Sequence, residues 1–306
     1  MDQKQNANAA APAPGSEEKA LGLEELVKKA GDLQMMPQVA RKVIELVADE
    51  NSNAAQLATL LEKDPNITTR ILKIANSAFY GLRRECKTVQ QAIVILGFKS
   101  LRSMVVASSS KALHKRFGIA EQLMWDHSIG TAIGAKVIAE GRPSVVGEMA
   151  FVGGLLHNVG KTIMNNECPK SYMEVMKRVY NQNVSPLQAE KEVFGYGHPE
   201  VGFRITEKWG LPADLSKVIR FHILTNLSES ERAPLYSEAQ LKLGLACVEI
   251  ASYLCRRLGI GFREKDSKID LMALEGTKVL QANPELLEKW SKRTEEIFLK
   301  ERSVFN

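Results

Sequence analysis

The stretch GLLHNVGK, residues 154–161, places a histidine, an asparagine and a lysine directly after an apolar helical turn. We predict that it belongs to a helix over residues 147–164, because apolar residues recur there with helical spacing. His157 and Asn158 end the apolar run, and Lys161 follows one helical turn later. Lys161 is either a contact for an anion or an ordinary surface lysine. The meaning of the stretch therefore depends on the rest of the fold.

The helical period continues through nearly every segment after Leu21. Runs with the alternating pattern of a strand are nearly absent, and the connections are short and carry Gly, Pro, Asn or Ser. Thr88 and either Ser52 or Asn53 are expected to cap helices. We predict an all-α fold with two packed helical lobes. From residue 119 onward the expected helices cover residues 119–140, 147–164, 169–182, 185–194, 198–209, 212–224, 235–258, 268–282 and 284–301.

The composition changes along the chain and suggests how it is organised. Residues 1–20 are rich in Ala, Pro, Asn and Gln without periodic apolar residues, so we expect a disordered leader. Residues 21–117 are expected to form an N-terminal helical lobe. Residues 118–225 are expected to form a second lobe that holds most of the histidines. Residues 226–306 are expected to form a C-terminal helical extension packed on that lobe.

The overall composition is that of an ordinary globular protein, with 44% hydrophobic and 25% charged residues. A net charge of +5 is too small for a dedicated nucleic-acid binder, and the three tryptophans are too scattered to form a base-stacking surface. No apolar run is long enough to span a membrane, and the N-terminus lacks an apolar signal segment. The cysteines form no CxxC pair, which favours a reducing compartment. We expect a cytoplasmic protein without a membrane or nucleic-acid partner.

The chain contains only five histidines, and four of them lie on or at the end of predicted helices. These are His127, His157, His198 and His222. Imidazoles that project inward from facing helices are one way to build a metal site. A single histidine on an apolar helix is more often a core or surface residue, and the wide spacing is no metal signature by itself. His114, in the basic run KALHKRF, is expected to lie in solvent.

Several stretches resemble known families. GLLHNVGK is similar to the LLHDIGK motif of the HD superfamily of metal-dependent phosphohydrolases, and WDHS and GHPEVG are similar to its upstream and downstream histidine motifs. MMPQVARKVIEL, LLEKDPNITTRILKIANSAFYG and TVQQAIVILGFKSLRSMVV resemble the N-terminal signature of the HDOD family, the HD-related output domain. The resemblance covers about residues 25–225. It implies an all-α, HD-like fold found in bacterial signalling proteins, usually with a degraded catalytic site.

The resemblance also implies a metal site that has lost its acids. In this resemblance, His127, His157, His198 and His222 occupy positions where catalytic HD proteins keep metal ligands, and Asn158 replaces the neighbouring aspartate. The resemblance thus predicts that the four rings converge. Ser252 stands where a catalytic relative has its last aspartate. A hydrolytic pair of ions needs carboxylates to offset its charge, which Asn and Ser do not supply. Neutral imidazoles suit one transition-metal ion such as Fe, Zn or Ni.

Two acids near the histidines are candidates to replace the missing carboxylates. Asp126 precedes His127, and Glu200 follows His198 by two residues. Side chains of neighbouring helical residues point about 100° apart, so we expect Asp126 to face away from the site. We expect no useful contribution from Glu200 either.

Three functions remain open at the level of the sequence. The favoured one is a non-catalytic signalling module, an output or adaptor domain that binds signalling proteins. The alternatives are a metal-dependent phosphohydrolase that acts on a nucleotide or cyclic dinucleotide, and a sensor that binds a ligand in the old pocket. Asn76, Phe79 and Tyr80 are either packing and turn residues or part of a surface for a partner.

Overall fold

The computed structural model describes residues 20–30, 38–48, 53–76, 82, 85–97, 101, 105, 109–115, 117–182 and 184–304. All regular elements in these ranges are helices, and no strand occurs among them. The all-α prediction is therefore confirmed. The expected leader, residues 1–20, lies outside the described residues except for its last position.

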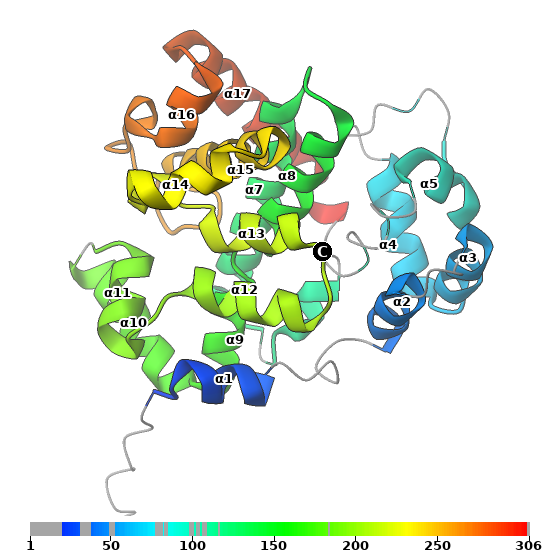
Figure 1. Cartoon of the computed structure of the whole chain (residues 1–306), viewed down its shortest axis with the longest axis horizontal. Coiled ribbons are helices and arrows are strands. Elements are labelled where there is room, and N and C mark those ends of the chain that lie inside the picture. Colours follow the sequence, from blue (N-terminus) through cyan, green and yellow to red (C-terminus); the bar gives the residue numbers. More distant parts are fainter. Residues whose placement is uncertain are drawn as a thin grey trace, which may run out of the picture.

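The first group of helices lies apart from the others at the right of Figure 1. Asn53 begins its second helix with a capping box, in which the Asn53 side chain accepts the backbone N–H of Gln56 at 3.0 Å and the Gln56 side chain accepts that of Asn53 at 2.9 Å. Thr88 caps the last helix as predicted. The group consists of α2 (Gln38–Ala48), α3 (Ala54–Glu62), α4 (Pro65–Asn76) and α5 (Val89–Leu96).

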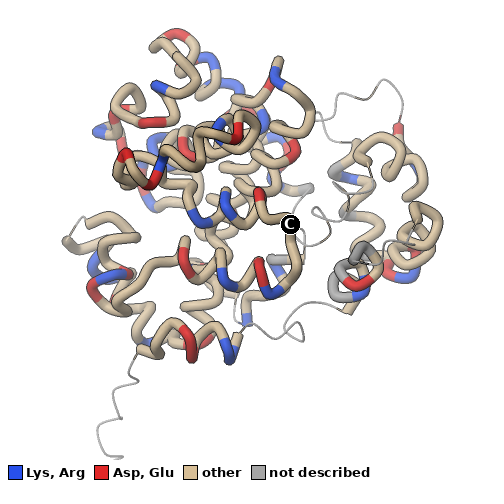
Figure 2. Tube along the Cα trace, in the orientation of Figure 1, with Lys and Arg blue, Asp and Glu red and all other residues tan. Residues whose placement is uncertain are grey.

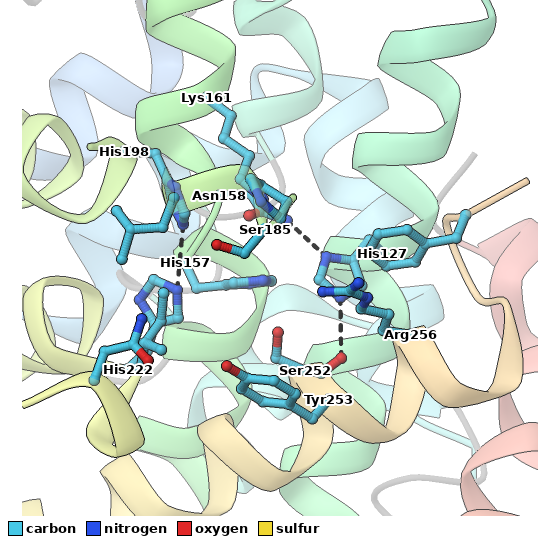
Figure 3. A pocket seen from close by; sticks show the side chains of 15 residues that line it. His127, His157, Asn158, Lys161, Ser185, His198, His222, Ser252, Tyr253 and Arg256 are labelled. Atoms are coloured by element: carbon cyan, nitrogen blue, oxygen red, sulfur yellow. Dashed lines mark hydrogen bonds between the residues drawn. The ribbon is translucent and has the colours of Figure 1, made fainter. Parts of the chain in front are cut away.

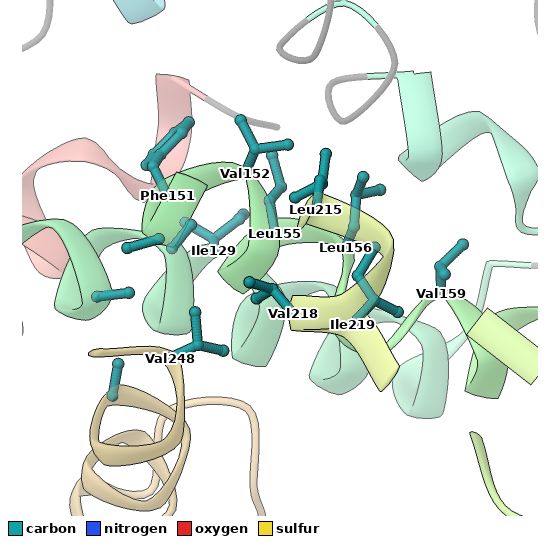
Figure 4. Packing of buried hydrophobic residues seen from close by; sticks show 14 of the residues in the cluster. Ile129, Phe151, Val152, Leu155, Leu156, Val159, Leu215, Val218, Ile219 and Val248 are labelled. Carbon is teal, nitrogen blue, oxygen red and sulfur yellow. The ribbon is translucent and has the colours of Figure 1, made fainter. Parts of the chain in front are cut away.

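The core of the larger lobe is built from four helices whose apolar faces meet in Figure 4. Ile129, Phe151, Val218 and Val248 each come from a different one of these helices and are buried there. The last helix packs against both of the first two, so the C-terminal part of the chain supplies a central helix of the lobe. The four helices are α7 (Ile119–Ala139), α8 (Ser144–Leu156), α13 (Ala213–Phe221) and α15 (Ala239–Leu258).

The other elements surround this core. The expected helix over 235–258 is divided, because α14 ends at Tyr236 and α15 begins at Ala239. Glu249 on α15 accepts the backbone N–H of Thr225 at 2.6 Å and of Gly276 at 2.7 Å, which ties two flanking elements to the core. The surrounding elements are η2 (Ser110–Leu113), α9 (Val159–Glu167), α10 (Pro169–Gln182), α11 (Pro186–Phe194), α12 (His198–Lys208), η3 (Leu224–Asn226), α14 (Glu229–Tyr236), η4 (Leu271–Ala273), α16 (Glu275–Leu280), α17 (Pro284–Glu301) and η5 (Arg302–Val304).

The first described helix, α1 (Leu23–Ala30), packs against α9 and α12 of the larger lobe. The Tyr196 hydroxyl donates to the carbonyl oxygen of Leu21 at 2.7 Å, and Lys208 Nζ donates to that of Val27 at 3.2 Å. The sequence assigned this helix to the N-terminal lobe, but its contacts lie with the second.

The helix predicted over residues 147–164 is two helices, α8 and α9, with a break at His157 and Asn158. Each half packs against a different neighbour at a glycine. A Cβ on Gly154 would lie 2.8 Å from the backbone of α7, and one on Gly160 would collide with the carbonyl oxygen of His198 on α12. The chain bends between the two glycines, where α8 packs on α7 and α9 packs on α12.

Basic and acidic residues are mixed along the helices. Figure 2 shows Lys and Arg interspersed with Asp and Glu, without a large face of one sign in this view. Among the helices that the structure describes, none is both long and apolar enough to cross a lipid bilayer.

Candidate functional site

The structure brings together the four predicted histidines (Figure 3). The ring centroid of His157 lies 5.0 Å from that of His127 and 5.1 Å from that of His222. The His198 and His222 centroids are 5.3 Å apart. The rings come from the middle of α7, the end of α8, the start of α12 and the end of α13. Two glycine contacts, α8 against α7 and α9 against α12, allow these helices to approach.

Three of the histidines direct a bare ring nitrogen into the site. His157 Nδ1 and His222 Nδ1 each donate to the backbone carbonyl three residues earlier, at 2.6 and 2.9 Å. His198 Nδ1 donates to Glu190 Oε2 at 2.6 Å. Neutral imidazole carries one proton, so the three Nε2 atoms are lone-pair acceptors. His198 Nε2 and His222 Nε2 are 3.4 Å apart, and His157 Nε2 is buried without a partner in the described part of the chain.

His127 is held differently, because both of its nitrogens have partners. Asn158 Nδ2 donates to His127 Nδ1 at 2.9 Å, and His127 Nε2 donates to the backbone carbonyl of Ser252 at 3.2 Å. The Ser252 carbonyl can only accept, so Nε2 carries the ring proton and Nδ1 must accept. This fixes the orientation of the Asn158 amide and leaves its buried Oδ1 without a partner among the described residues.

A buried carboxylate, that of Glu190, is hydrogen-bonded to His198. Glu190 on α11 is fully buried, and its Oε2 accepts both the ring Nδ1 and the backbone N–H of His198, the latter at 2.8 Å. Burial raises the pKa of Glu190 to about 7, although the charge of Lys161 acts in the opposite direction. The sequence analysis did not identify Glu190. Its only signal is an acid in the helix that precedes the GHPEVG segment.

The histidines are neutral in this environment. Burial, together with the positive charge of Lys161, lowers the pKa of His127 to about 3. Burial and the neighbouring His198 lower that of His222 to about 3 as well. The pKa values of His157 and His198 are also held well below the usual range, chiefly by burial. Lys161 also lines this cavity, and its positive charge contributes to lowering the pKa of all four rings.

The cluster lines a cavity of about 70 Å³, which is room for a few water molecules. Arg256 on α15 and Phe262 after it form part of the wall, and the Phe262 ring meets the edge of His127 at a centroid distance of 4.9 Å. No carboxylate is found among the residues that line the cavity. They are His127, His157, Asn158, Lys161, Ser185, Pro186, Leu187, His198, His222, Ile223, Asn226, Ser252, Tyr253, Arg256 and Phe262.

The acids next to the histidines face elsewhere, as expected. Asp126 Oδ1 accepts a hydrogen bond from Gln122 at 3.0 Å, and Glu200 pairs with Arg220 at 3.5 Å. His114 stays outside the cavity, but the prediction that it lies in solvent is wrong. It is half-buried against Phe117, at a ring centroid distance of 5.6 Å, because residues 110–113 fold into a turn of 3-10 helix.

The residues do not fit a pair of hydrolytic metal ions. Such a centre needs carboxylates, and the residues that line the cavity, Asn158 and Ser252 among them, include none. In the described part of the chain, no group of three or more His, Cys, Asp or Glu side chains is arranged to hold a metal ion. Lys161 adds a positive charge to the lining of the same cavity.

The predicted partner surface is only partly described. Asn76 Nδ2 donates to the carbonyl oxygen of Cys86 at 2.7 Å, and Asn76 Oδ1 accepts the Cys86 N–H at 2.6 Å. These bonds join the end of α4 to the segment before α5, which is a structural role. Phe79 and Tyr80 lie outside the described residues.

Known proteins share this fold. A crystal structure of an HDOD domain protein of unknown function from Geobacter sulfurreducens has a TM-score of 0.70 and 23% identity, over 92% of this chain and 96% of that chain. A proposed phosphohydrolase from Shewanella amazonensis has a TM-score of 0.63 and 23% identity, over 90% of this chain and 97% of that chain. At these identities the likeness shows the fold alone.

Sequence comparison adds the family. An uncharacterised protein of Treponema pallidum is 22% identical over 207 residues, which are 66% of this chain and 40% of the relative, so this chain spans less than half the length of that relative. The model of the HDOD domain matches residues 33–224, well over half of the chain. The chain therefore belongs to the HDOD family.

Proposed function

We propose that this protein is a non-catalytic signalling module, an output or adaptor domain that acts by binding other signalling proteins. The observation that carries the proposal is the charge of the cavity. It keeps the histidines of an HD-type site, but it is lined by Lys161 and Arg256 and by no carboxylate. The resemblance to HD-related output domains supports the signalling role, and the absence of a membrane-spanning helix among the described residues agrees with a cytoplasmic place of action.

Hydrolysis by two metal ions needs groups that bind the ions and offset their charge, and the residues that line the cavity do not supply these groups. A pair of divalent ions brings a charge of about +4, and neutral imidazoles offset none of it. The Asn158 amide donates its N–H to His127, and Ser252 contributes a backbone carbonyl to the same ring. His127 therefore has no free lone pair for a metal ion in this arrangement.

A single transition-metal ion such as Fe, Zn or Ni is the second candidate for the cavity. The rings are not arranged to hold an ion among the described residues. They would have to move for His157, His198 and His222 to bind it through Nε2, with Asn158 beside them. The observation that favours this is that each Nδ1 is already bound to a carbonyl or carboxylate, as is usual for histidines that bind metals. When bound, such an ion would act as a Lewis acid toward an oxygen ligand.

Partner binding is tested by capture from the source bacterium, followed by reconstitution of the complex from purified proteins. The matched variant is His157→Ala, which changes the cavity and leaves the surface intact, because His157 is buried. We expect wild type and variant to bind the partner with equal affinity in the absence of added metal. Failure of the purified proteins to form a complex would contradict the adaptor role.

A further inference from the structure

A groove of about 410 Å³ lies on the surface between the start of α7 and α10. Met173, Met176 and Tyr180 line it from α10, at positions that share one face of the helix. Ile119 and Leu123 line it from α7, one helical turn apart. Ile119 is 80% exposed and Met173 is 57% exposed. Large apolar side chains gathered in an exposed groove mark a binding surface, and methionine adapts its shape to a partner.

A smaller cavity of about 40 Å³ lies between this groove and the histidine cavity. It shares Leu123 and Met176 with the groove, and His127 and Phe262 with the histidine cavity. All the residues that it shares with the groove are apolar or aromatic, and an apolar cavity accepts a hydrocarbon group in place of water. A ligand of the groove therefore finds an anchoring place for one apolar side chain.

The basic side chains of the groove are available to a ligand. Arg263 lies over the ring of Tyr180, with Cζ 4.4 Å from the ring centroid, and forms no ion pair among the described residues. Lys177 pairs with Glu174 at 3.7 Å, but both side chains are exposed, and such a pair contributes little. Both cations can therefore meet an acidic group of a partner.

The acidic residue that lines the groove is already bound within the chain. Glu121 Oε2 accepts the backbone N–H of Gly118 at 2.9 Å, and Glu121 Oε1 accepts the side-chain amide of Asn165 at 2.7 Å. These bonds hold the carboxylate against the start of α7. The charge that the groove offers to a ligand is therefore positive, and a partner of complementary charge is acidic.

We propose that this groove binds an amphipathic helix of a partner protein, with acidic residues beside its apolar stripe. The stripe lies along Met173 and Ile119, and one large apolar side chain enters the smaller cavity. Aspartate or glutamate at the edge of the stripe meets Arg263 and Lys177. Helices bind in apolar grooves through anchors at i, i+3, i+4 and i+7, a spacing that matches the two turns of α10 from Met173 to Tyr180. The inference rests on the proposed function, because it names the surface through which the adaptor recognises its partner.

The first test measures binding of two designed helical peptides of about 18 residues to the full chain. One peptide carries leucines along one face and glutamates beside them, and the other carries lysines in place of the glutamates. We expect the glutamate peptide to bind at least about tenfold more tightly, because opposite charges meet across the groove. Equal affinities, or no binding of the glutamate peptide, would overturn the proposal.

Reversal of one charge separates a local effect from misfolding. Arg263→Glu should weaken binding of the glutamate peptide and strengthen binding of the lysine peptide, each by about threefold or more. A misfolded variant would not gain affinity for either peptide. The matched control is Lys289→Glu, the same change of charge on the exposed face of α17, and it should keep the preference of wild type. An unchanged preference in Arg263→Glu would contradict the role of this cation.

The second test uses the partner captured for the adaptor role. Met173→Glu places a like charge in the groove and should weaken the complex of purified proteins about tenfold or more. Met272→Glu makes the same change at another exposed methionine, on η4, and should leave the affinity unchanged. Unchanged affinity in Met173→Glu would overturn this inference and leave the adaptor role intact. Failure of the wild-type proteins to form a complex would contradict the adaptor role itself.

Two other occupants of the groove are distinguished with the same variant. Sedimentation of wild type and Met173→Glu shows whether a second copy of the chain binds there, and flotation with phosphatidylglycerol vesicles shows whether a lipid surface does. We expect neither self-association nor vesicle binding to depend on Met173. Loss of a dimer, or of vesicle binding, in Met173→Glu would overturn the proposal in favour of that occupant.

Discussion

At the scale of the residue, the amide of Asn158 sets the hydrogen bonding of His127 and so bears on what the cavity can hold. Asn158 donates to His127 Nδ1, which an ionised aspartate cannot do. An aspartate would require the ring proton of His127 on Nδ1, so Nε2 would become available as a lone pair. It would also add a negative charge beside Lys161. Both changes favour a cation over an anion.

We therefore predict that Asn158→Asp increases the transition-metal content of the purified protein, measured by elemental analysis after growth with added Mn²⁺ or Fe²⁺. The matched control is Asn181→Asp, the same change at an exposed position on α10, and its metal content should equal that of wild type. Unchanged metal content in Asn158→Asp would show that charge at this position does not control metal binding.

The residues of the cavity were predictable to different degrees. The histidine motifs identified all four rings and Lys161, because each motif keeps its residue types at a fixed spacing. The roles within the cluster were not predictable, since they depend on which carbonyl or carboxylate meets each Nδ1. Glu190 was missed because it lies eight positions before its partner and on another helix, where an acid looks like any surface residue.

At the scale of the element, the close contact of α9 with α12 holds His157 and Asn158, which directly precede α9, near His198 at the start of α12. Gly160 lies against the backbone of His198, with no space for a Cβ atom. We predict that Gly160→Ala separates the two helices and destabilises the protein by about 1–3 kcal/mol, as overpacking does. Urea denaturation measures the difference in the free energy of unfolding.

The control for this prediction is Gly22→Ala, since a Cβ atom on Gly22 would meet nothing within 4 Å. Its free energy of unfolding should stay close to that of wild type. If Gly160→Ala proves as stable as Gly22→Ala, the contact is not what positions α9.

Helices were predictable where the apolar period is regular, and their ends were not. The period runs without interruption through GGLLHNVGK, so a single helix was expected across the break at His157 and Asn158. The break comes from packing of α8 and α9 on different partners, which is information about the fold and not about the local sequence. Likewise, α1 joins the larger lobe because it packs on α9 and α12, which its own sequence does not show.

At the scale of the whole molecule, Glu167 joins three segments that are distant in the sequence. Its side chain is 2% exposed and pairs with Lys115 at 2.6 Å and Lys29 at 3.1 Å. Burial alone would raise the pKa of Glu167, but the hydrogen bonds and charges of the two lysines outweigh it, so the pKa is lowered. The pairs therefore stabilise the folded state when the carboxyl is ionised.

We predict that Glu167→Gln lowers the free energy of unfolding by about 1 kcal/mol at pH 7, a modest value because both lysines are half-exposed. A lowered folded-state pKa gives stability that is present above the unfolded pKa and is lost as the pH falls through the folded pKa. The difference from wild type should thus shrink in acid. Urea denaturation at pH 7 and at an acidic pH tests this. The control is Glu174→Gln, a change at an exposed ion-pair residue. A constant difference at both pH values would contradict it.

The central proposal, that this HDOD protein is a non-catalytic module, is tested most directly by turnover of phosphodiesters, including a cyclic dinucleotide, in the presence of Mn²⁺ or Fe²⁺. Wild type is measured beside His157→Ala, which removes an imidazole from the centre of the cluster. We predict no turnover by wild type above the level of His157→Ala. A wild-type rate near that of an ordinary enzyme, about 10 per second, that is lost in His157→Ala would contradict the claim.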